Sequence, residues 1–205
     1  VSLKDARLKH VVPSSVTVIK GDILDTSLLK DIASNNSFDA IIHLAAQAGV
    51  RYSIENPDTY IQTNVQGTNN MFELAKEFNI PKVVYASSSS VYGGNEKVPF
   101  SETDDVSSPI SLYAASKKMN ELQANVYNNL YGTSMVGLRF FTVYGPWGRP
   151  DMADLKFLNN MFDKKPIDVY NHGDMKRDFT FVNDIVDGVL ISLEDRKSTR
   201  LNSSH

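Results

Sequence analysis

The stretch "KVVYASSSSVYGG", residues 82–94, decides the fold of this chain. Its first half is a β-branched and aromatic run of the kind that lies in the middle of a sheet. Four serines follow it directly, although serine runs usually mark flexible linkers. A serine run makes physical sense here if the strand belongs to a parallel sheet, because such sheets bind their ligands at the carboxyl ends of their strands.

The rest of the chain supports a parallel sheet, because apolar runs alternate with helical patterns. Further short buried strands are predicted for "VTVIK" (16–20), "FDAIIHLA" (38–45) and "MVGLRFF" (135–141). Segments with apolar residues at helical spacing separate them: 27–36, 58–79 and 111–132, the last ending at Tyr131-Gly132. Strands joined by helices of this length indicate βαβ crossovers and an α/β fold.

The composition is that of a globular protein without a strong charge. Of 205 residues, 41% are hydrophobic, and the formal net charge is −3, which argues against nucleic acid as a partner. The absence of cysteine excludes disulfides and thiolate chemistry. No apolar run is long enough to cross a bilayer, so we expect a cytoplasmic protein, with a membrane anchor before Val1 left open.

The pattern changes at Thr142, where "TVYGPWGRPDMA" is rich in glycine, proline and arginine. A helical segment, "DLKFLNNMFDKK", and a strand-like "PIDVY" follow, and "FTFVNDIVDGVLISL" returns to a strand and an apolar helix. We therefore expect residues 1–141 to form part of a nucleotide-binding domain. Residues 142–177 would begin a substrate-binding region, and residues 178–194 would return to the first domain.

The last eleven residues, "DRKSTRLNSSH" (195–205), are polar and without a period. All eleven match the translation of a common sequencing-library adapter. We interpret this tail as a read-through artefact and leave it out of the functional reasoning.

The motif with chemical meaning is "YAASK", which places Tyr113 and Lys117 one turn apart on one face of a helix. A nearby ammonium favours the phenolate of tyrosine, which can then act as a base. Alone, such a pair is weak evidence, but Ser88 lies 25 residues earlier at a predicted strand end. Serine, tyrosine and lysine in this order suit hydride transfer at a secondary alcohol.

These motifs, with "RFFTVYGPWGRPDMA" and "KRDFT", resemble the extended short-chain dehydrogenase/reductases, in the NAD-dependent epimerase/dehydratase family. Within it the chain is most similar to UDP-glucuronate 4-epimerases, over residues 1–194. The resemblance implies a Rossmann-like doubly wound parallel sheet, bound NAD, a UDP-sugar substrate, no metal and a homodimer. It implies a catalytic role for Ser88, Tyr113 and Lys117.

The resemblance also implies roles for further residues of this sequence. Cofactor-binding positions, besides Tyr113 and Lys117, are Asp22, Ile23, Leu44, Ala45, Ala46, Asn64 and Phe141. Substrate-binding positions are Ser89, Ser90, Thr142, Arg149 and Arg177. The planar fork of arginine suits a diphosphate or carboxylate group. His43, in an apolar strand, is interpreted as a core residue, and the role of Trp147 is left open.

One departure from the family is marked. None of the eleven glycines forms the Gly-rich signature that brings the cofactor pyrophosphate to a helix N-terminus. The sequence begins like the segment after a second strand, so we expect about one strand–helix–strand unit before Val1 and more chain after the helix that ends near 194. We expect this piece alone to be inactive.

Several reactions remain open at this point. Related dehydratases carry Asp-Glu after the catalytic serine or threonine, whereas this chain has Ser89 and Ser90, which disfavours dehydration. Thr142 stands where neutral-sugar epimerases tend to carry asparagine. We hypothesise that these three hydroxyls bind the carboxylate of a uronic acid. A UDP-glucuronate decarboxylase, a neutral UDP-sugar 4-epimerase and a non-catalytic nucleotide-binding regulator are the alternatives.

Overall fold

The computed structural model describes residues 2–194 and 201–202. The chain divides into two compact units, each described by itself below. One comprises Val1–Asp22 and Tyr144–Lys176, and the other comprises Ile23–Val143 and Arg177–His205. Most of the tail interpreted as an artefact, residues 195–200 and 203–205, lies outside the described residues.

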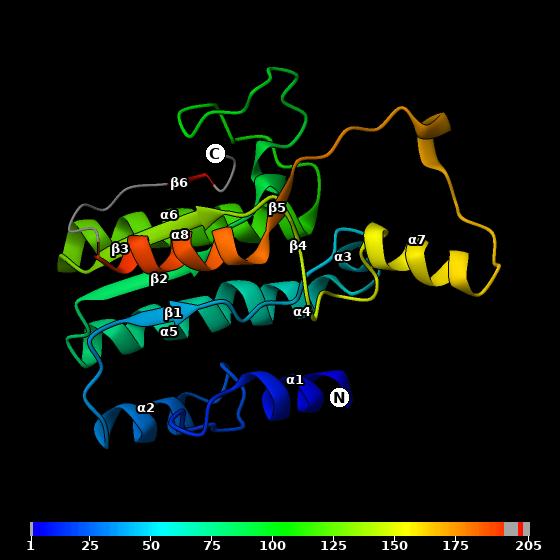
Figure 1. The fold of residues 1–205 in the computed structure, drawn as a ribbon. Coiled ribbons are helices and arrows are strands. Elements are labelled where there is room, and N and C mark those ends of the chain that lie inside the picture. The colour runs from blue at the N-terminus through cyan, green and yellow to red at the C-terminus, as the bar shows by residue number, and fades with distance from the viewer. Residues whose placement is uncertain (1, 195–200, 203–205) are drawn as a thin grey trace. The chain divides into compact units, whose positions relative to one another are not determined.

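The larger unit is built on a parallel sheet whose strands lie in the order β1-β2-β3-β6 (Figure 1). All three pairings are parallel, and Tyr85 of β2 lies opposite His43 of β1 and Gly137 of β3. The strands are β1 (Ile41–His43), β2 (Lys82–Ala86), β3 (Ser134–Arg139) and β6 (Leu201–Asn202). The predicted strands 38–45, 82–87 and 135–141 are therefore confirmed, with shorter bounds.

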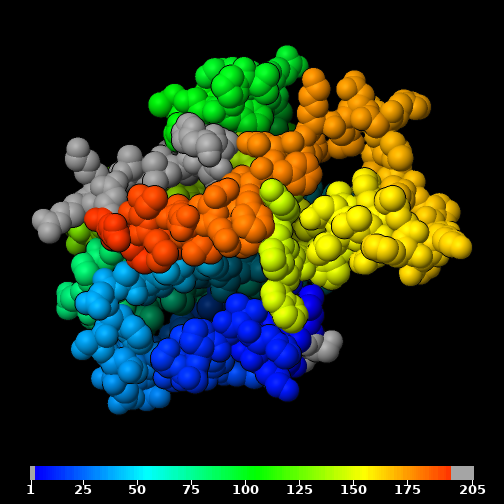
Figure 2. Space-filling model, viewed as in Figure 1, coloured from blue at the N-terminus to red at the C-terminus, as the bar shows by residue number. Residues whose placement is uncertain are grey.

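Helices cover both faces of this sheet, as the prediction of a doubly wound fold requires. On one face, α5 (Gly67–Glu77) and α6 (Leu112–Tyr131) enclose a core that includes Phe72, Val83 and Tyr127. On the other face, α8 (Val182–Glu194) packs Val189 against Val84 and other residues of β2 and β3. Figure 2 shows the outer side of α8, orange to red, at the molecular surface.

A glycine in the centre of β3 makes room for one of these core side chains. A Cβ added to Gly137 would lie 2.5 Å from the hydroxyl and 2.6 Å from Cζ of Tyr85, which stands opposite in the register. Real Cβ atoms do not approach other atoms so closely, so Tyr85 can lie flat over β3 only because position 137 has no side chain.

The remaining elements of the larger unit connect or flank the sheet. They are α2 (Thr26–Ser34), α3 (Tyr52–Glu55), α4 (Pro57–Tyr60), the π-helix η1 (Ile61–Gln66), the 3₁₀-helix η2 (Ser89–Tyr92), and the strand pair β4 (Thr142–Tyr144) and β5 (Phe179–Phe181). Asp25 caps the N-terminus of α2, since its carboxylate accepts the Leu28 N–H at 3.0 Å.

The smaller unit contains α1 (Ser2–Val11), α7 (Ala153–Phe162) and the short 3₁₀ segment η3 (Tyr170–Gly173). The strand predicted for 16–20 is wrong: the segment is irregular, and Val16, Val18 and Ile19 are each about half exposed. A strand needs a partner ladder, and no strand pairs with this segment within the described part of the unit. The prediction of a strand for "PIDVY" is also wrong, because residues 166–169 are irregular.

No helix in the described part of the chain combines the length and the apolar character that crossing a membrane would require.

Candidate active site

The serine run continues the sheet instead of forming a linker. Beyond the end of β2, the Ser87 N–H donates to the Leu138 carbonyl at 2.8 Å, and the Ser89 N–H donates to the Phe140 carbonyl at 2.9 Å. Ser88 between them is extended, with φ −159° and ψ 146°, and it caps η2. The serines are thus fixed at the carboxyl end of a central parallel strand, where ligands of such sheets bind.

The hydroxyl of Ser88 has a defined direction. Its Oγ accepts two hydrogen bonds from one residue, from the Ser90 N–H at 3.2 Å and from the Ser90 hydroxyl at 2.9 Å. A hydroxyl has two lone pairs and one hydrogen. Because both lone pairs are engaged, the hydrogen of Ser88 remains to be donated to a ligand.

Helix α6 brings Tyr113 and Lys117 to this end of the sheet. Ser111 caps the helix by accepting the Ala114 N–H at 3.1 Å, and α6 packs against both η2 and β3. The Lys117 ammonium donates to the Ala86 carbonyl at 2.8 Å, which places its charge two residues before Ser88. The structure therefore brings the serine run and the lysine of "YAASK" together, as predicted from the sequence.

Lys117 is buried, with only 3% of its surface exposed. Burial lowers the pKa of its ammonium from 10.5 to about 8, because the charged form loses hydration. Tyr113, one turn earlier, is half-buried, and its ring meets Tyr60 edge to face with centroids 6.1 Å apart. Tyr60 is held in turn by donating to the Gly49 carbonyl at 2.6 Å. A tyrosine beside a buried ammonium is suited to proton transfer.

The segment after β1 is attached to α6 through Asn64, which lies in the π-helix η1 and is fully buried. Its Oδ1 accepts the Gln47 N–H at 2.8 Å. Its amide nitrogen donates to the Gln47 carbonyl and to the Ser116 hydroxyl, each at 3.0 Å. Asn64 thereby fixes the course of the chain just past Leu44, Ala45 and Ala46. Leu44 and Ala45 are exposed, so they are accessible to a ligand.

His43 is a core residue, as its apolar strand predicts. It is 5% exposed, and its Nε2 lies 2.9 Å from the Thr68 hydroxyl. Burial, and secondarily the charge of Lys117, lowers the pKa of the imidazole from 6.5 to about 4. The ring is therefore neutral at neutral pH.

Phe141 and Thr142 lie beyond β3, and Phe141 is close to η2. Phe141 is half-buried, and its ring centroid lies 6.3 Å from that of Tyr92 in η2. Thr142 begins β4, and its N–H donates to the Asp178 carbonyl at 3.3 Å. Arg177, which immediately precedes Asp178, is exposed. These three residues therefore belong to the same unit as Ser88.

The other predicted site residues are not all in this unit. Ile23 is, and it packs against α5, where a Cβ on Gly67 would lie 2.4 Å from its Cδ1. Asp22 and Arg149 belong to the smaller unit. Arg149 forms an ion pair with Asp151, in which the arginine Nε donates to Oδ1 of the aspartate at 3.1 Å.

Trp147 also belongs to the smaller unit. Its ring stacks on His10 with centroids 6.0 Å apart, and its carbonyl accepts a hydrogen bond from Arg7 at 2.5 Å. These contacts give the residue a packing role within its own unit.

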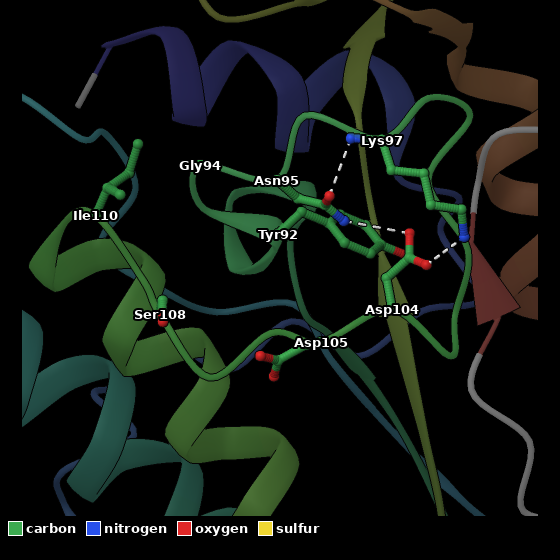
Figure 3. Close-up of a pocket in the computed structure, with 8 residues that line it drawn as sticks. All are labelled: Tyr92, Gly94, Asn95, Lys97, Asp104, Asp105, Ser108 and Ile110. Atoms are coloured by element: carbon green, nitrogen blue, oxygen red, sulfur yellow. Dashed lines mark hydrogen bonds and ion pairs between the residues drawn. The ribbon is translucent and has the colours of Figure 1, made fainter.

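A cavity of about 460 Å³ is lined by residues other than those predicted to be catalytic (Figure 3). It is lined by Tyr92 and by the loop that leads to α6, and neither Ser88, Tyr113 nor Lys117 is among its lining residues. Its carboxylate Asp104 already accepts hydrogen bonds from Lys97 and Asn95. The pKa of Asp104 is lowered mainly by the Lys97 hydrogen bond. The cavity is a loop-lined surface hollow, and the reacting groups lie elsewhere.

Sequence reasoning missed a buried ion pair next to the serine run. Arg139, the last residue of β3, donates from Nε and from one terminal nitrogen to Glu121 of α6, at 2.9 and 3.0 Å. Glu121 lies one helical turn after Lys117, a spacing that places it on the same helix face and that the sequence already contained. In the described residues, no group of three or more histidine, aspartate or glutamate side chains is arranged to hold a metal ion.

Known proteins resemble this chain in sequence. The sequence model of the family described as "NAD dependent epimerase/dehydratase family" matches residues 2–202. The chain is 51% identical to UDP-glucuronate 4-epimerase 1 of Arabidopsis thaliana over 203 residues, covering 97% of this chain and 47% of the relative. It is 52% identical to Protein CapI of Staphylococcus aureus, covering 92% of this chain and 57% of that protein.

Solved structures with a similar fold include two UDP-sugar 4-epimerases. The UDP-glucuronic acid 4-epimerase of Bacillus cereus, in complex with UDP-glucuronic acid and NAD, has a TM-score of 0.87 at 33% identity, covering 99% of this chain and 65% of that chain. The UDP-glucose 4-epimerase of Thermus thermophilus, in complex with NAD, has a TM-score of 0.87 at 28% identity, covering 94% of this chain and 65% of that chain. The chain spans about half the length of the curated relatives it matches.

Proposed function

The chain belongs to the NAD-dependent epimerase/dehydratase family, and on that premise we propose that it carries the catalytic residues of a UDP-sugar 4-epimerase. The proposed substrate is a UDP-sugar acid, with UDP-glucuronate and UDP-galacturonate interconverted at C4. The observation that carries the proposal is the buried Lys117 ammonium on the Ala86 carbonyl, near Ser88, whose Oγ accepts twice from Ser90, and one turn from Tyr113.

The residues at this sheet edge fit the nicotinamide half of NAD. The Lys117 ammonium has three donors and uses one on the Ala86 carbonyl, so two remain for ribose hydroxyls and for Tyr113. Leu44 and Ala45 offer an exposed strand end beside it, and Phe141 offers an aromatic face near η2. When bound, NAD supplies the acceptor and donor of hydride.

The protein side of the reaction is proton transfer and positioning. Tyr113, as the phenolate, removes the proton of the C4 hydroxyl as that carbon is oxidised, and it returns the proton when the 4-keto sugar is reduced on its opposite face. The charge of Lys117 stabilises the phenolate. Ser88 donates its hydrogen to the C4 oxygen, and its Oγ accepts from the Ser90 N–H and, before a sugar acid binds, from the Ser90 hydroxyl.

If the substrate is a sugar acid, the enzyme must also prevent its decarboxylation. Oxidation at C4 gives a β-keto acid, which loses CO₂ if its carboxylate turns perpendicular to the ring carbonyl plane. We propose that Ser89, Ser90 and Thr142 hold the carboxylate by hydroxyl hydrogen bonds, with Ser90 exchanging its bond to Ser88 for one to the carboxylate. Arg149 and Arg177 are proposed to contact the diphosphate, which suits their planar forks.

The carboxylate contacts can be tested through Thr142→Ala. The variant frees the β-keto acid to reach the perpendicular geometry, so the share of UDP-pentose among the products should rise. A product ratio equal to that of the wild type would argue against the contact.

The function itself is tested by incubating the full-length gene product with UDP-glucuronate and, separately, with UDP-glucose, with and without added NAD, and separating the sugar nucleotides by anion exchange. UDP-galacturonate is the expected product. UDP-pentose and CO₂ would indicate a decarboxylase. Turnover of UDP-glucose alone would indicate a neutral-sugar epimerase, and NAD binding without turnover of either sugar would indicate a regulator.

We also propose a homodimer, formed through the outer side of α6. Met119, Leu122, Val126 and Leu130 follow one another at helical spacing there, and each is 45% to 67% exposed. A second copy would bury this stripe in a two-fold helix pair. Sedimentation of the wild type and of Val126→Glu tests this: the wild type should be dimeric and the variant monomeric.

A further inference from the structure

The ion pair between Glu121 and Arg139 is among the most deeply buried charged groups in the described residues, with 2% and 1% of their surfaces exposed. Its two hydrogen bonds are nearly equal in length, as in a two-pronged arginine–carboxylate pair. Burial by itself would raise the pKa of Glu121, but hydrogen bonds from Arg139 and Ser87 outweigh it and hold the pKa below its ordinary value. The pair is therefore charged at neutral pH.

The pair joins the elements that surround Ser88. The Ser87 hydroxyl donates to Oε1 of Glu121 at 2.7 Å, so the residue immediately before Ser88 is attached to α6. Arg139 donates through its other terminal nitrogen to the Glu102 carbonyl at 3.3 Å. Its guanidinium also lies 5.0 Å from the ring centroid of Tyr92, at the end of η2.

Stability alone is a poor reason for such a pair. A buried ion pair loses so much hydration that apolar residues of similar size often stabilise a protein as well or better. What the pair does provide is a directional anchor at a fixed place. Successive side chains of an extended backbone point to opposite sides. An anchor on the Ser87 side chain therefore sets the orientation of the next hydroxyl, that of Ser88.

We propose that Ser87 is a positioning residue for the reaction, which orients Ser88 through its hydrogen bond to the buried Glu121–Arg139 pair. The proposal rests on the proposed function, because it assigns Ser88 the donor to the C4 oxygen. It adds three residues to the site, none of which touches the substrate.

The first test is Ser87→Ala in the full-length enzyme, with Ser192→Ala as a matched control. Ser192 is likewise a buried serine that donates one hydrogen bond, to the Gly188 carbonyl at 2.6 Å within α8. Ser87→Ala should lower kcat about tenfold with KM within about twofold, because small displacements of a catalytic group act on the rate. Ser192→Ala should leave both constants near the wild type. Ser87→Thr, which keeps the hydroxyl, should recover most of kcat.

The second test is a double-mutant cycle with Ser88→Ala. If Ser87 acts through Ser88, then Ser87→Ala should lower kcat by less than about twofold once Ser88 is already alanine. An undiminished tenfold loss in that background, or equal losses for Ser87→Ala and Ser192→Ala, would overturn the proposal. Wild-type turnover of UDP-glucuronate is measured first, since its absence refutes the proposed function. The cycle is run on UDP-glucuronate if the wild type turns it over, and on UDP-glucose if the wild type turns over only that sugar.

Discussion

The buried imidazole of His43 predicts a specific loss of stability in acid. The ring ends β1 with its Nε2 on the Thr68 hydroxyl, and its pKa is about 4, against 6.5 for an ordinary histidine. Below pH 6.5 the unfolded chain binds a proton at this residue, whereas the folded protein does not until the pH approaches 4. The free energy of unfolding therefore falls as the pH falls through this window, and it is unaffected by His43 above it.

The size of the effect follows from the two pKa values. Between pH 7.5 and pH 4.5, the difference in proton binding is worth roughly 2–3 kcal/mol. The asparagine of His43→Asn does not titrate, so this part of the pH dependence should vanish. The variant should be less stable than the wild type at pH 7.5, because it leaves space in the core, and should approach it at pH 4.5.

Urea unfolding of the wild type and of His43→Asn at the two pH values measures this difference. If wild type and His43→Asn lost the same free energy between pH 7.5 and pH 4.5, the desolvation argument for His43 would be refuted.

Three further changes have definite expected outcomes. Tyr113→Phe removes the proposed base and should lower kcat by about 10³-fold, while the NAD released on denaturation equals that of the wild type. Gly67→Ala forces a Cβ to within 2.4 Å of Cδ1 of Ile23 and should cost about 1–3 kcal/mol of unfolding free energy; combining it with Ile23→Val, which removes that atom, should reduce the cost. Glu121→Leu leaves the buried charge of Arg139 without its carboxylate and should cost about 3–5 kcal/mol. Adding Arg139→Met should recover most of this stability but not kcat, and recovery of both would count against a positioning role.

Local patterns predicted the parts of the fold that depend on neighbours in the sequence. The end of α6 at Tyr131 was predicted because Gly132 follows it, and Gly132 indeed adopts a left-handed conformation with φ 69°. The strands at 82–87 and 135–141 were predicted from β-branched runs that are buried on both faces. The prediction of a strand at 16–20 is wrong, because apolar residues alone do not show whether a partner strand lies beside the segment.

Features that depend on distant side chains could not be predicted in this way. Residues 58–79 suggested one continuous helix, but η1 is a π-helix, and the Asn64 carbonyl accepts a hydrogen bond from Asn120, 56 positions later, at 2.8 Å. Periodicity does not reveal such a pairing. Likewise, the sequence alone predicts that Glu121 is a charged residue on the helix surface, because it does not show that Arg139 of β3 forms an ion pair with it.

The serine run shows why four small hydroxyl residues are needed at one strand end. Ser87 donates into a buried carboxylate, and a residue without a hydroxyl would leave that carboxylate short of a donor. Ser88 keeps its hydrogen for a ligand because Ser90 donates to it twice, and Ser89 extends the ladder to β3 through its backbone. Replacing Ser89 and Ser90 by acidic residues would remove the hydroxyl that orients Ser88 and place charge where a carboxylate is proposed to bind. The same local change would thus weaken the proposed hydrogen bond from Ser88 to the C4 oxygen and repel a sugar acid.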